Sequence, residues 1–279
     1  MLNPDDFKLA IQAIDALGAT PAVLVKVAKL ADNPNTDITT ICDLLRNDGP
    51  LVADLIRISN SPYYGPAEPH GNLSSAVHQI GLREVIHVVH LILSRRIFAR
   101  DLPGYGVSAQ DYWSDSLAAA LVMEGLAKQT GLKPEDAYTI GILHAIGRVL
   151  INHVINEQGF SVYWDAHHPV EDWERDMVGF DYAESGALLL DHWRFPPAMC
   201  DIVRWQLNPE KVTEPVSLLG ALQFTLRLLD LTGLDFEANG WRLPDNDPFI
   251  QASGLTPEAI SQLVAACRVE FHRILQSVA

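Results

Sequence analysis

The sequence YTIGILHAIGRVL, at residues 138–150, combines an apolar helical pattern with two glycines and one histidine. Gly141 and Gly147 have no side chain, so neighbouring helices can approach the backbone closely at both positions. His144 is flanked by apolar residues, and the pattern therefore predicts an interior position for its imidazole. We expect one helix over about residues 134–154, opened by a proline at its first position.

Apolar residues repeat at helical spacing along most of the chain, and helix caps separate the repeats. Thr20 before Pro21 is typical of a helix start, and Gly18 and Gly131 follow apolar runs, where helix C-caps occur. No alternation of apolar and polar residues is long enough for a convincing sheet. We therefore predict an all-α fold in one helical module of residues 1–279. The pattern predicts further helices near residues 5–17, 20–32, 38–44, 50–56, 74–80, 85–98, 108–130, 182–193, 197–206, 215–230 and 256–277.

The chain carries 35 acidic and 20 basic residues, a formal net charge of −15. Nucleic-acid affinity is built mainly from Lys and Arg contacts to phosphate, and anionic membranes attract the same basic groups. We therefore expect neither nucleic acid nor a membrane as a partner. Cys42, Cys200 and Cys267 are too widely spaced for a disulfide framework or a metal motif, and the acidic N-terminus does not resemble a signal peptide. These features predict a soluble, cytoplasmic protein, and they leave homo-oligomerisation open.

Four short motifs follow one another upstream of residue 138: DGPL at 48–51, NSPYYG at 60–65, LSSAV at 73–77 and IGL at 80–82. In order and spacing they resemble the signatures of HDOD domains, the HD-related output domains of bacterial signalling proteins. Residues 138–150 in turn resemble the G-x-L-H-D-I-G helix of the HD superfamily of metal-dependent phosphohydrolases.

The resemblance covers about residues 13–210 and implies a division of the chain. An N-terminal helical subdomain is expected at 13–105, packed on an HD-like helical bundle at 106–210. A C-terminal helical extension is expected at 211–279.

The metal ligands of an HD hydrolase are poorly matched in this sequence. Asp115 stands where the first histidine would fall, Ala145 replaces the aspartate of the His-Asp doublet, and Tyr182 occupies a later histidine position. Residues 204–206, RWQ, stand where many members have a histidine pair. Only His144 remains, whereas a catalytic divalent-metal site needs about three protein ligands and an open position for water. We therefore predict no metal ligands, no catalytic residues and no cofactor.

The resemblance implies a non-catalytic signal-transduction or regulatory module that acts through contacts with a protein partner, whose identity the sequence does not reveal. Two alternatives stay open. The first is a residual metal-dependent phosphohydrolase. The second is a sensor that binds a small ligand, such as a nucleotide, in the former HD cavity, which His144, Asp115 and Tyr182 are expected to line.

The NSPYYG loop offers candidate residues of a different kind. Asn60 and Ser61 have short polar side chains suited to bonding backbone groups at the end of the preceding helix, and Pro62 stops that helix. Tyr63 and Tyr64 combine apolar area with a polar tip, a combination that is enriched at interfaces. We predict a structural role for this loop, and the alternative is a partner-binding patch.

Overall fold

The computed structural model describes residues 36–157 except 67, then 163–165, 167–233 and 246–278, with isolated positions at 11, 23, 26, 27 and 30. The described part consists of helices, short 3₁₀ turns and one isolated β-bridge between Leu102 and Val107, and it contains no strand. The predicted all-α fold is therefore confirmed. The helices predicted near 5–17 and 20–32 lie outside the described residues, apart from the isolated positions.

The chain forms two compact units. The described part of the first, here the N-terminal unit, comprises residues 36–97 together with 269–278. The second, here the central unit, comprises the described residues between 98 and 268. The last helix, α15 (Pro257–Val278), begins in the central unit and ends in the N-terminal unit. The domain limits predicted at about residues 105 and 210 stay a prediction.

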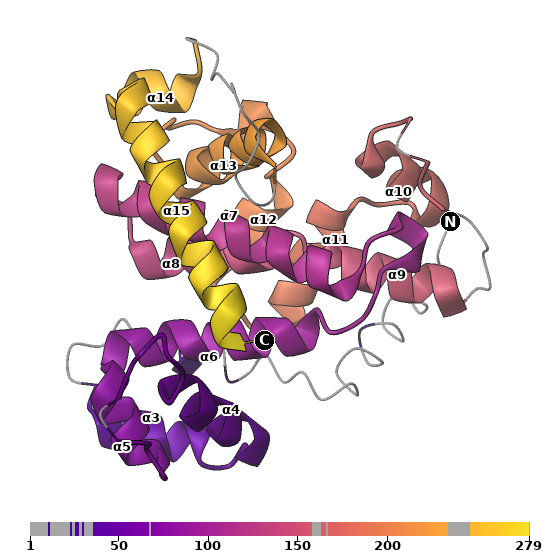
Figure 1. Ribbon diagram of the computed structural model, residues 1–279. Coiled ribbons are helices and arrows are strands. Elements are labelled where there is room, and N and C mark those ends of the chain that lie inside the picture. The colour runs from indigo at the N-terminus through magenta and orange to yellow at the C-terminus, as the bar shows by residue number, and fades with distance from the viewer. Residues whose placement is uncertain are drawn as a thin grey trace. The chain divides into compact units, whose positions relative to one another are not determined.

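Four helices make up most of the N-terminal unit: α3 (Ile38–Leu45), α4 (Gly49–Ser59), α5 (Leu73–Ile80) and α6 (Leu82–Ile97). Figure 1 shows α3, α4 and α5 close together, and α4 packs on both α5 and α6. Each of the first three begins at a short polar N-cap whose oxygen accepts a hydrogen bond from a first-turn amide, as free helix starts require. These caps are Asp37, Asp48 and Asn72.

The central unit is organised around α7 (Ala109–Thr130), which is buried along nearly its whole length. Ser108 caps its start, and Gly131 ends it in the left-handed conformation, as the sequence predicts. Helices α8 (Pro134–Leu143) and α13 (Leu218–Thr232) pack against it. A Cβ atom built on Gly141 of α8 would lie 2.5 Å from the Cα of Ala120, so α8 and α7 meet backbone to backbone.

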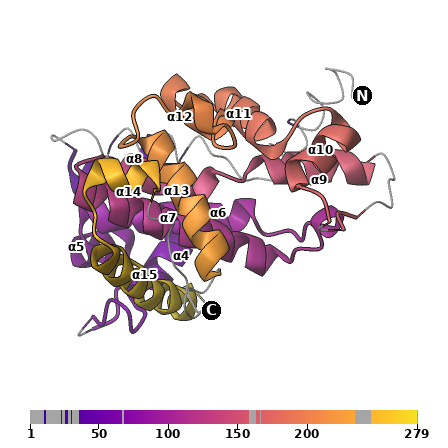
Figure 2. The same cartoon turned by 90° about the horizontal axis from the view of Figure 1, so that it is seen from above.

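Four further helices belong to the central unit: α9 (Gly147–Glu157), α10 (Val170–Val178), α11 (Tyr182–His192) and α12 (Pro197–Arg204). Helix α11 packs on α9 and α12, and α10 packs on α9 (Figure 2). The sequence patterns miss α10, which is mostly charged, and the short α14 (Pro248–Ser253). Short 3₁₀ turns occur at Pro103–Tyr105 and Pro209–Lys211.

The single helix predicted over residues 134–154 is wrong, because the chain breaks between α8 and α9. Around the break, amides donate to the carbonyl three residues earlier rather than four, which tightens and interrupts the helix (Ile146 to Leu143, Arg148 to Ala145 and Val149 to Ile146, at 3.0–3.1 Å). The apolar pattern continues through the break, so periodicity alone does not reveal it.

Gly147 starts α9 where the backbone of α11 approaches most closely. A Cβ atom at this position would lie 2.0 Å from the carbonyl oxygen of Tyr182 and 2.5 Å from the amide nitrogen of Gly186. Real Cβ atoms do not approach backbone atoms so closely, so any other residue must push the two helices apart. The glycine therefore permits the crossing of α9 and α11.

Among the described residues, one helical stretch, 134–157, is apolar and long enough to cross a membrane by length and composition alone. Helices α5 and α6 pass the same test only as a sharply bent pair. In the 134–157 stretch, 83% of the apolar window is buried inside the protein, as in a core helix.

We predict that Gly147→Ala lowers the free energy of unfolding by about 3 kcal/mol, because its methyl group collides with the backbone of α11. Urea denaturation followed by circular dichroism measures this change. Gly49→Ala is the matched control: it also lies at a helix start, but its Cβ meets nothing within 4 Å, so its stability should change by less than about 1 kcal/mol. Equal losses in the two variants would contradict the close-approach argument.

Candidate functional site

The break between α8 and α9 frees backbone carbonyls in the interior, and three side chains satisfy them. The Nδ1–H of His144 donates to the carbonyl of Gly141 at 2.7 Å. The side-chain amide of Gln206 donates to the carbonyl of His144 at 2.8 Å, and the hydroxyl of Tyr112 donates to that of Ala145 at 2.5 Å. Buried carbonyls need such partners, so the turn is held by α7 and by the chain that follows α12.

A guanidinium lies directly beyond this turn. The Cζ atom of Arg148 lies 4.4 Å from the ring centre of Tyr182 and 5.8 Å from that of Tyr105. Both tyrosines are 5% exposed, and the Nε atom of Arg148 is shielded from solvent. Such cation–π contacts strengthen when water is excluded. The burial opposes the charge of Arg148, but Tyr182 and Asp115 outweigh this effect and raise its pKa.

Glu174 of α10 completes the tyrosine side of the cluster. Its side chain is fully buried and accepts two hydrogen bonds, from the hydroxyl of Tyr105 at 2.8 Å and from the backbone amide of Tyr182 at 2.7 Å. Burial raises the pKa of Glu174 to about 7, although the charge of Arg148 and the two hydrogen bonds act in the opposite direction. The cluster thus contains a carboxyl group that titrates near neutral pH.

Asp115 of α7 is only partly buried and is close enough to influence the pKa of His144. Burial lowers the pKa of His144, and the nearby charge of Asp115 offsets only part of this effect. His144 is therefore a neutral imidazole at pH 7. Burial and the charge of Asp115 raise the pKa of Asp230 on α13, so two acidic groups lie near one another here.

The structure thus brings together His144, Asp115 and Tyr182, the three residues that the sequence places in the former HD cavity. Their mutual electrostatic influence, and that of Arg148, show that they share one neighbourhood. The sequence analysis misses Arg148, although it lies within the segment first quoted. It also misses three partners whose sequence contexts give no signal of a site: Tyr105, Tyr112 and Glu174.

The residues present do not fit a divalent metal ion. Within the described ranges, no three His, Cys, Asp or Glu side chains are grouped closely enough to hold a metal. Tyr182 turns its ring face to a guanidinium rather than presenting a metal ligand. A divalent ion placed here would meet the fixed positive charge of Arg148, which is unfavourable in a poorly solvated interior.

The NSPYYG loop of the N-terminal unit is tied down by its polar atoms. The Asn60 side chain donates to the carbonyl of His70 at 2.9 Å and accepts from its amide at 2.7 Å, so its partner lies ten residues further along rather than at the helix end. The Oγ atom of Ser61 is buried and has no hydrogen-bond partner among the described residues, unlike the expected backbone contact.

The two tyrosines of this loop are half-buried and both hydroxyls are engaged. Tyr63 donates to Glu270 of α15 at 2.6 Å, and Tyr64 donates to Glu84 of α6 at 2.9 Å. Arg273 lies 5.3 Å from the Tyr63 ring centre. These contacts favour a structural role within the N-terminal unit. A role in binding a partner stays an alternative.

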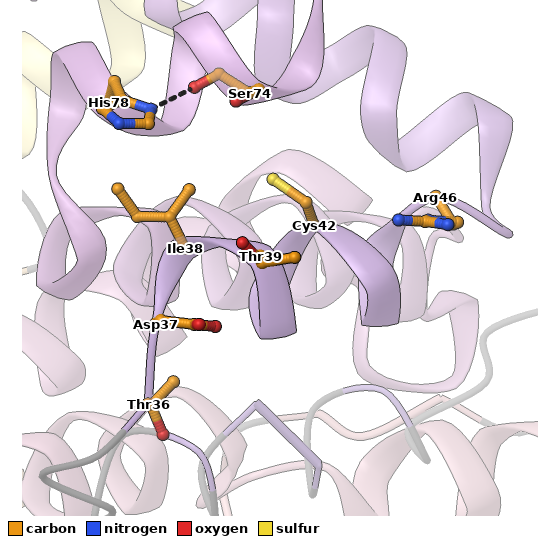
Figure 3. A pocket seen from close by; sticks show the side chains of 8 residues that line it. All are labelled: Thr36, Asp37, Ile38, Thr39, Cys42, Arg46, Ser74 and His78. Atoms are coloured by element: carbon orange, nitrogen blue, oxygen red, sulfur yellow. Dashed lines mark hydrogen bonds between the residues drawn. The ribbon is translucent and has the colours of Figure 1, made fainter.

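A hollow of about 710 Å³ opens on the N-terminal unit between α3 and α5 (Figure 3). Its charged or basic lining side chains are already engaged: Asp37 caps α3, Arg46 pairs with Asp43, and the His78 ring bonds to the carbonyl of Ser74 at 3.0 Å. Burial raises the pKa of the Cys42 thiol in the lining, which disfavours the nucleophilic thiolate. The hollow therefore lacks the reactive or unpaired groups of an active site.

Solved structures of other proteins share this all-helical architecture. The "Putative phosphohydrolase" of Shewanella amazonensis SB2B is 22% identical, with a TM-score of 0.66 over 97% of this chain and 98% of that one. The "Putative signal transduction protein" of Marinobacter aquaeolei VT8 is 20% identical, with a TM-score of 0.70 over 98% of this chain and 64% of that one. At these identities the likeness shows the fold alone.

The fold defines an all-helical domain like that of these two solved structures. The HDOD domain model matches residues 17–209, and the chain belongs to the HDOD domain family. A curated relative, an uncharacterised protein of Treponema pallidum (strain Nichols), is 25% identical over 226 residues, which is 78% of this chain. This chain spans only 43% of the length of that relative.

Asn60→Ala should lower the free energy of unfolding by about 1–2 kcal/mol, because it removes both side-chain bonds to the backbone of His70. Ser61→Ala, the neighbouring control, removes a hydroxyl without a described partner and should change stability by less than about 0.5 kcal/mol. Chemical denaturation of the two variants measures the difference. A larger loss for Ser61→Ala than for Asn60→Ala would contradict the observed bonding.

Glu174→Gln should remove a pH dependence of stability. The pKa of Glu174 is about 7 in the folded protein against an ordinary value of 4.5, so between these values the unfolded chain releases its proton first. Rising pH therefore destabilises the native state, by about 3 kcal/mol in total from this group. Unfolding free energies measured from pH 4.5 to 7.5 should favour the variant increasingly over the wild type. A constant difference across this range would rule out the shifted carboxyl.

Proposed function

We propose that this HDOD domain is a non-catalytic signal-transduction module of a bacterial pathway and acts through contacts with a protein partner. The family and the fold support a relationship to HD phosphohydrolases and to a protein named for signal transduction. The loss of catalysis is our inference from the central cluster, and the use of protein contacts is what the resemblance to HDOD domains implies.

The observation that carries the proposal is the guanidinium of Arg148, 4.4 Å from the ring centre of Tyr182. Tyr182 stands at a position where the resemblance expects a metal ligand, and a fixed cation now covers its ring. Residue 145, where the second half of a His-Asp doublet would stand, is an alanine whose carbonyl is held by Tyr112. Side chains that would hold a metal and activate water are thus replaced by groups that hold the fold.

A residual phosphohydrolase is the main competing function, because two solved structures of similar fold carry that name. Hydrolysis in such a site depends on a metal-bound hydroxide, which one imidazole cannot generate. His144 donates its Nδ1–H to the carbonyl of Gly141, and no group of three metal-ligating side chains contains it among the described residues. The lack of further ligands favours a packing role for His144 over a catalytic one.

A nucleotide sensor is the second competing function, and no contact in the cluster favours it. A phosphate group entering near Asp115 would meet that carboxylate and, close by, Asp230. Phosphate sites are instead built from several converging basic groups or helix N-termini. We therefore place signal transmission at a protein surface. The proposal includes a cytoplasmic location. It names no particular partner and is compatible with self-association.

Metal content and hydrolysis of bis(p-nitrophenyl) phosphate test the non-catalytic assignment. We expect the purified protein to hold well under one equivalent of Fe, Mn or Zn and to hydrolyse the ester no faster than His144→Ala, with or without added Mn²⁺. One full equivalent of metal, lost together with ester hydrolysis in the His144→Ala variant, would establish the enzyme instead. Elemental analysis after gentle purification and a colorimetric assay give both results.

Partner capture tests the other half of the proposal. The full chain, immobilised at low density, should retain a defined protein from extracts of the source bacterium at physiological salt. Binding should then be reproduced with the purified partner at a fixed stoichiometry. Capture abolished by Tyr63→Phe or Tyr64→Phe, with unchanged melting temperature, would assign the NSPYYG loop to the contact surface. Saturable binding of a nucleotide, with no protein retained, would favour the sensor.

A further inference from the structure

Arg148 is partly exposed, and it is the positively charged member of a group that otherwise contains mostly buried tyrosines, a neutral histidine and carboxylates. It forms no ion pair shorter than 4.0 Å with a described residue, and its Nε is shielded from solvent and has no hydrogen-bond partner there. Taking a cation even partly out of water without such partners is costly. Its surroundings must therefore stabilise it in another way.

The surroundings do so through four side chains on four elements. The ring of Tyr182 on α11 lies 4.4 Å from the guanidinium carbon, and the ring of Tyr105 lies 5.8 Å away. The charges of Asp115 and Glu174 also favour the charged guanidinium. Arg148 of α9 is thus stabilised by one side chain from each of four elements: α7, α10, α11 and the 3₁₀ turn at Pro103–Tyr105.

We propose that Arg148 is the built-in cation of this cluster: its guanidinium balances the Glu174 and Asp115 carboxylates and clamps the Tyr182 ring, so that the cluster is complete without a metal ion. The inference concerns how the central unit is held together and does not depend on the partner proposed above.

Arginine suits this task better than lysine would. The guanidinium is planar and weakly hydrated, so it stacks on aromatic rings and tolerates burial. Glu174 cannot leave the cluster easily, because Tyr105 and the amide of Tyr182 hold both of its oxygens. The carboxyl group of Glu174 therefore keeps its position when Arg148 is replaced. Its negative charge then lacks the positive charge that Arg148 supplies.

The test is a double-mutant cycle between Arg148→Met and Glu174→Gln, measured as melting temperature at pH 8. Methionine keeps much of the side-chain volume and removes the charge. We expect Arg148→Met to lower the melting temperature by roughly 10 °C, since it leaves a buried carboxylate without its counter-charge. Glu174→Gln should then raise the melting temperature of Arg148→Met by at least about 5 °C more than it raises that of the wild type.

Arg175 provides the control, because it follows Glu174 directly on α10. Its side chain is 48% exposed and pairs with the buried Asp181 and with Glu184. Arg175→Met lowers the melting temperature through the loss of these pairs, but Glu174→Gln should have the same effect with Arg175 present or replaced. A coupling that is equally large in both cycles would overturn the specific role of Arg148.

A second measurement separates charge from packing. Ethylguanidinium at about 20 mM should raise the melting temperature of Arg148→Ala by a few degrees and should not raise that of Arg175→Ala or the wild type. An unchanged melting temperature in Arg148→Met, or a loss that Glu174→Gln does not reduce, would overturn the proposal. If Arg148→Met does not fold, recovery of folding in the double variant supports the charge balance, and failure of both variants overturns it.

Discussion

Buried carbonyls at the break between α8 and α9 constrain the centre of the molecule. A helix that stops in the interior leaves carbonyl oxygens without water or a helical partner, and each must be satisfied. The carbonyls of Gly141, His144 and Ala145 are satisfied by side chains from the turn itself, from α7 and from the residues after α12. The position of the turn therefore fixes the relative placement of these elements, and the cluster around Arg148 forms beside them.

The electrostatics of the cluster follow from the same placement. Once the turn sets Arg148 at the start of α9, its side chain lies among Tyr182, Tyr105 and Glu174, where water is scarce. Attraction and repulsion are both strong in such an environment, so a polar network is stable only when its charges are balanced. The proposal of a non-catalytic module and the inference about Arg148 depend on this balance in different ways. The non-catalytic module requires that the cluster holds no metal ion that could activate water. The inference about Arg148 requires that the protein supplies its own cation.

The sequence predicts helix limits well where the signal is local. The predicted ranges 108–130 and 38–44 agree with α7 and α3 to within one residue at each end. The fold class and the family follow from such signals and from the ordered motifs.

The break in residues 134–154 could not be predicted, because its apolar periodicity is continuous and its stabilising contacts come from distant positions. The role of Arg148 is not predicted for a similar reason. A single arginine in an apolar helix is usually placed at the surface, and only the tyrosines of distant segments bring its guanidinium partly into the interior. Asn60 was correctly expected to bond backbone groups, but its partner His70 depends on how the loop closes.

The discontinuous N-terminal unit has a consequence for how the protein is made. Tyr63 donates its hydrogen bond to Glu270, 207 positions later in the chain. At a synthesis rate of about 5–20 residues per second, roughly 10–40 s separate the appearance of these two residues on the ribosome. During this interval helices α3 to α6 exist without the end of α15, and Tyr63 lacks the hydrogen-bond partner that it has in the folded unit. Nascent chains that stop short of residue 270 therefore contain an incomplete N-terminal unit, on which quality control can act until residues 269–278 are made.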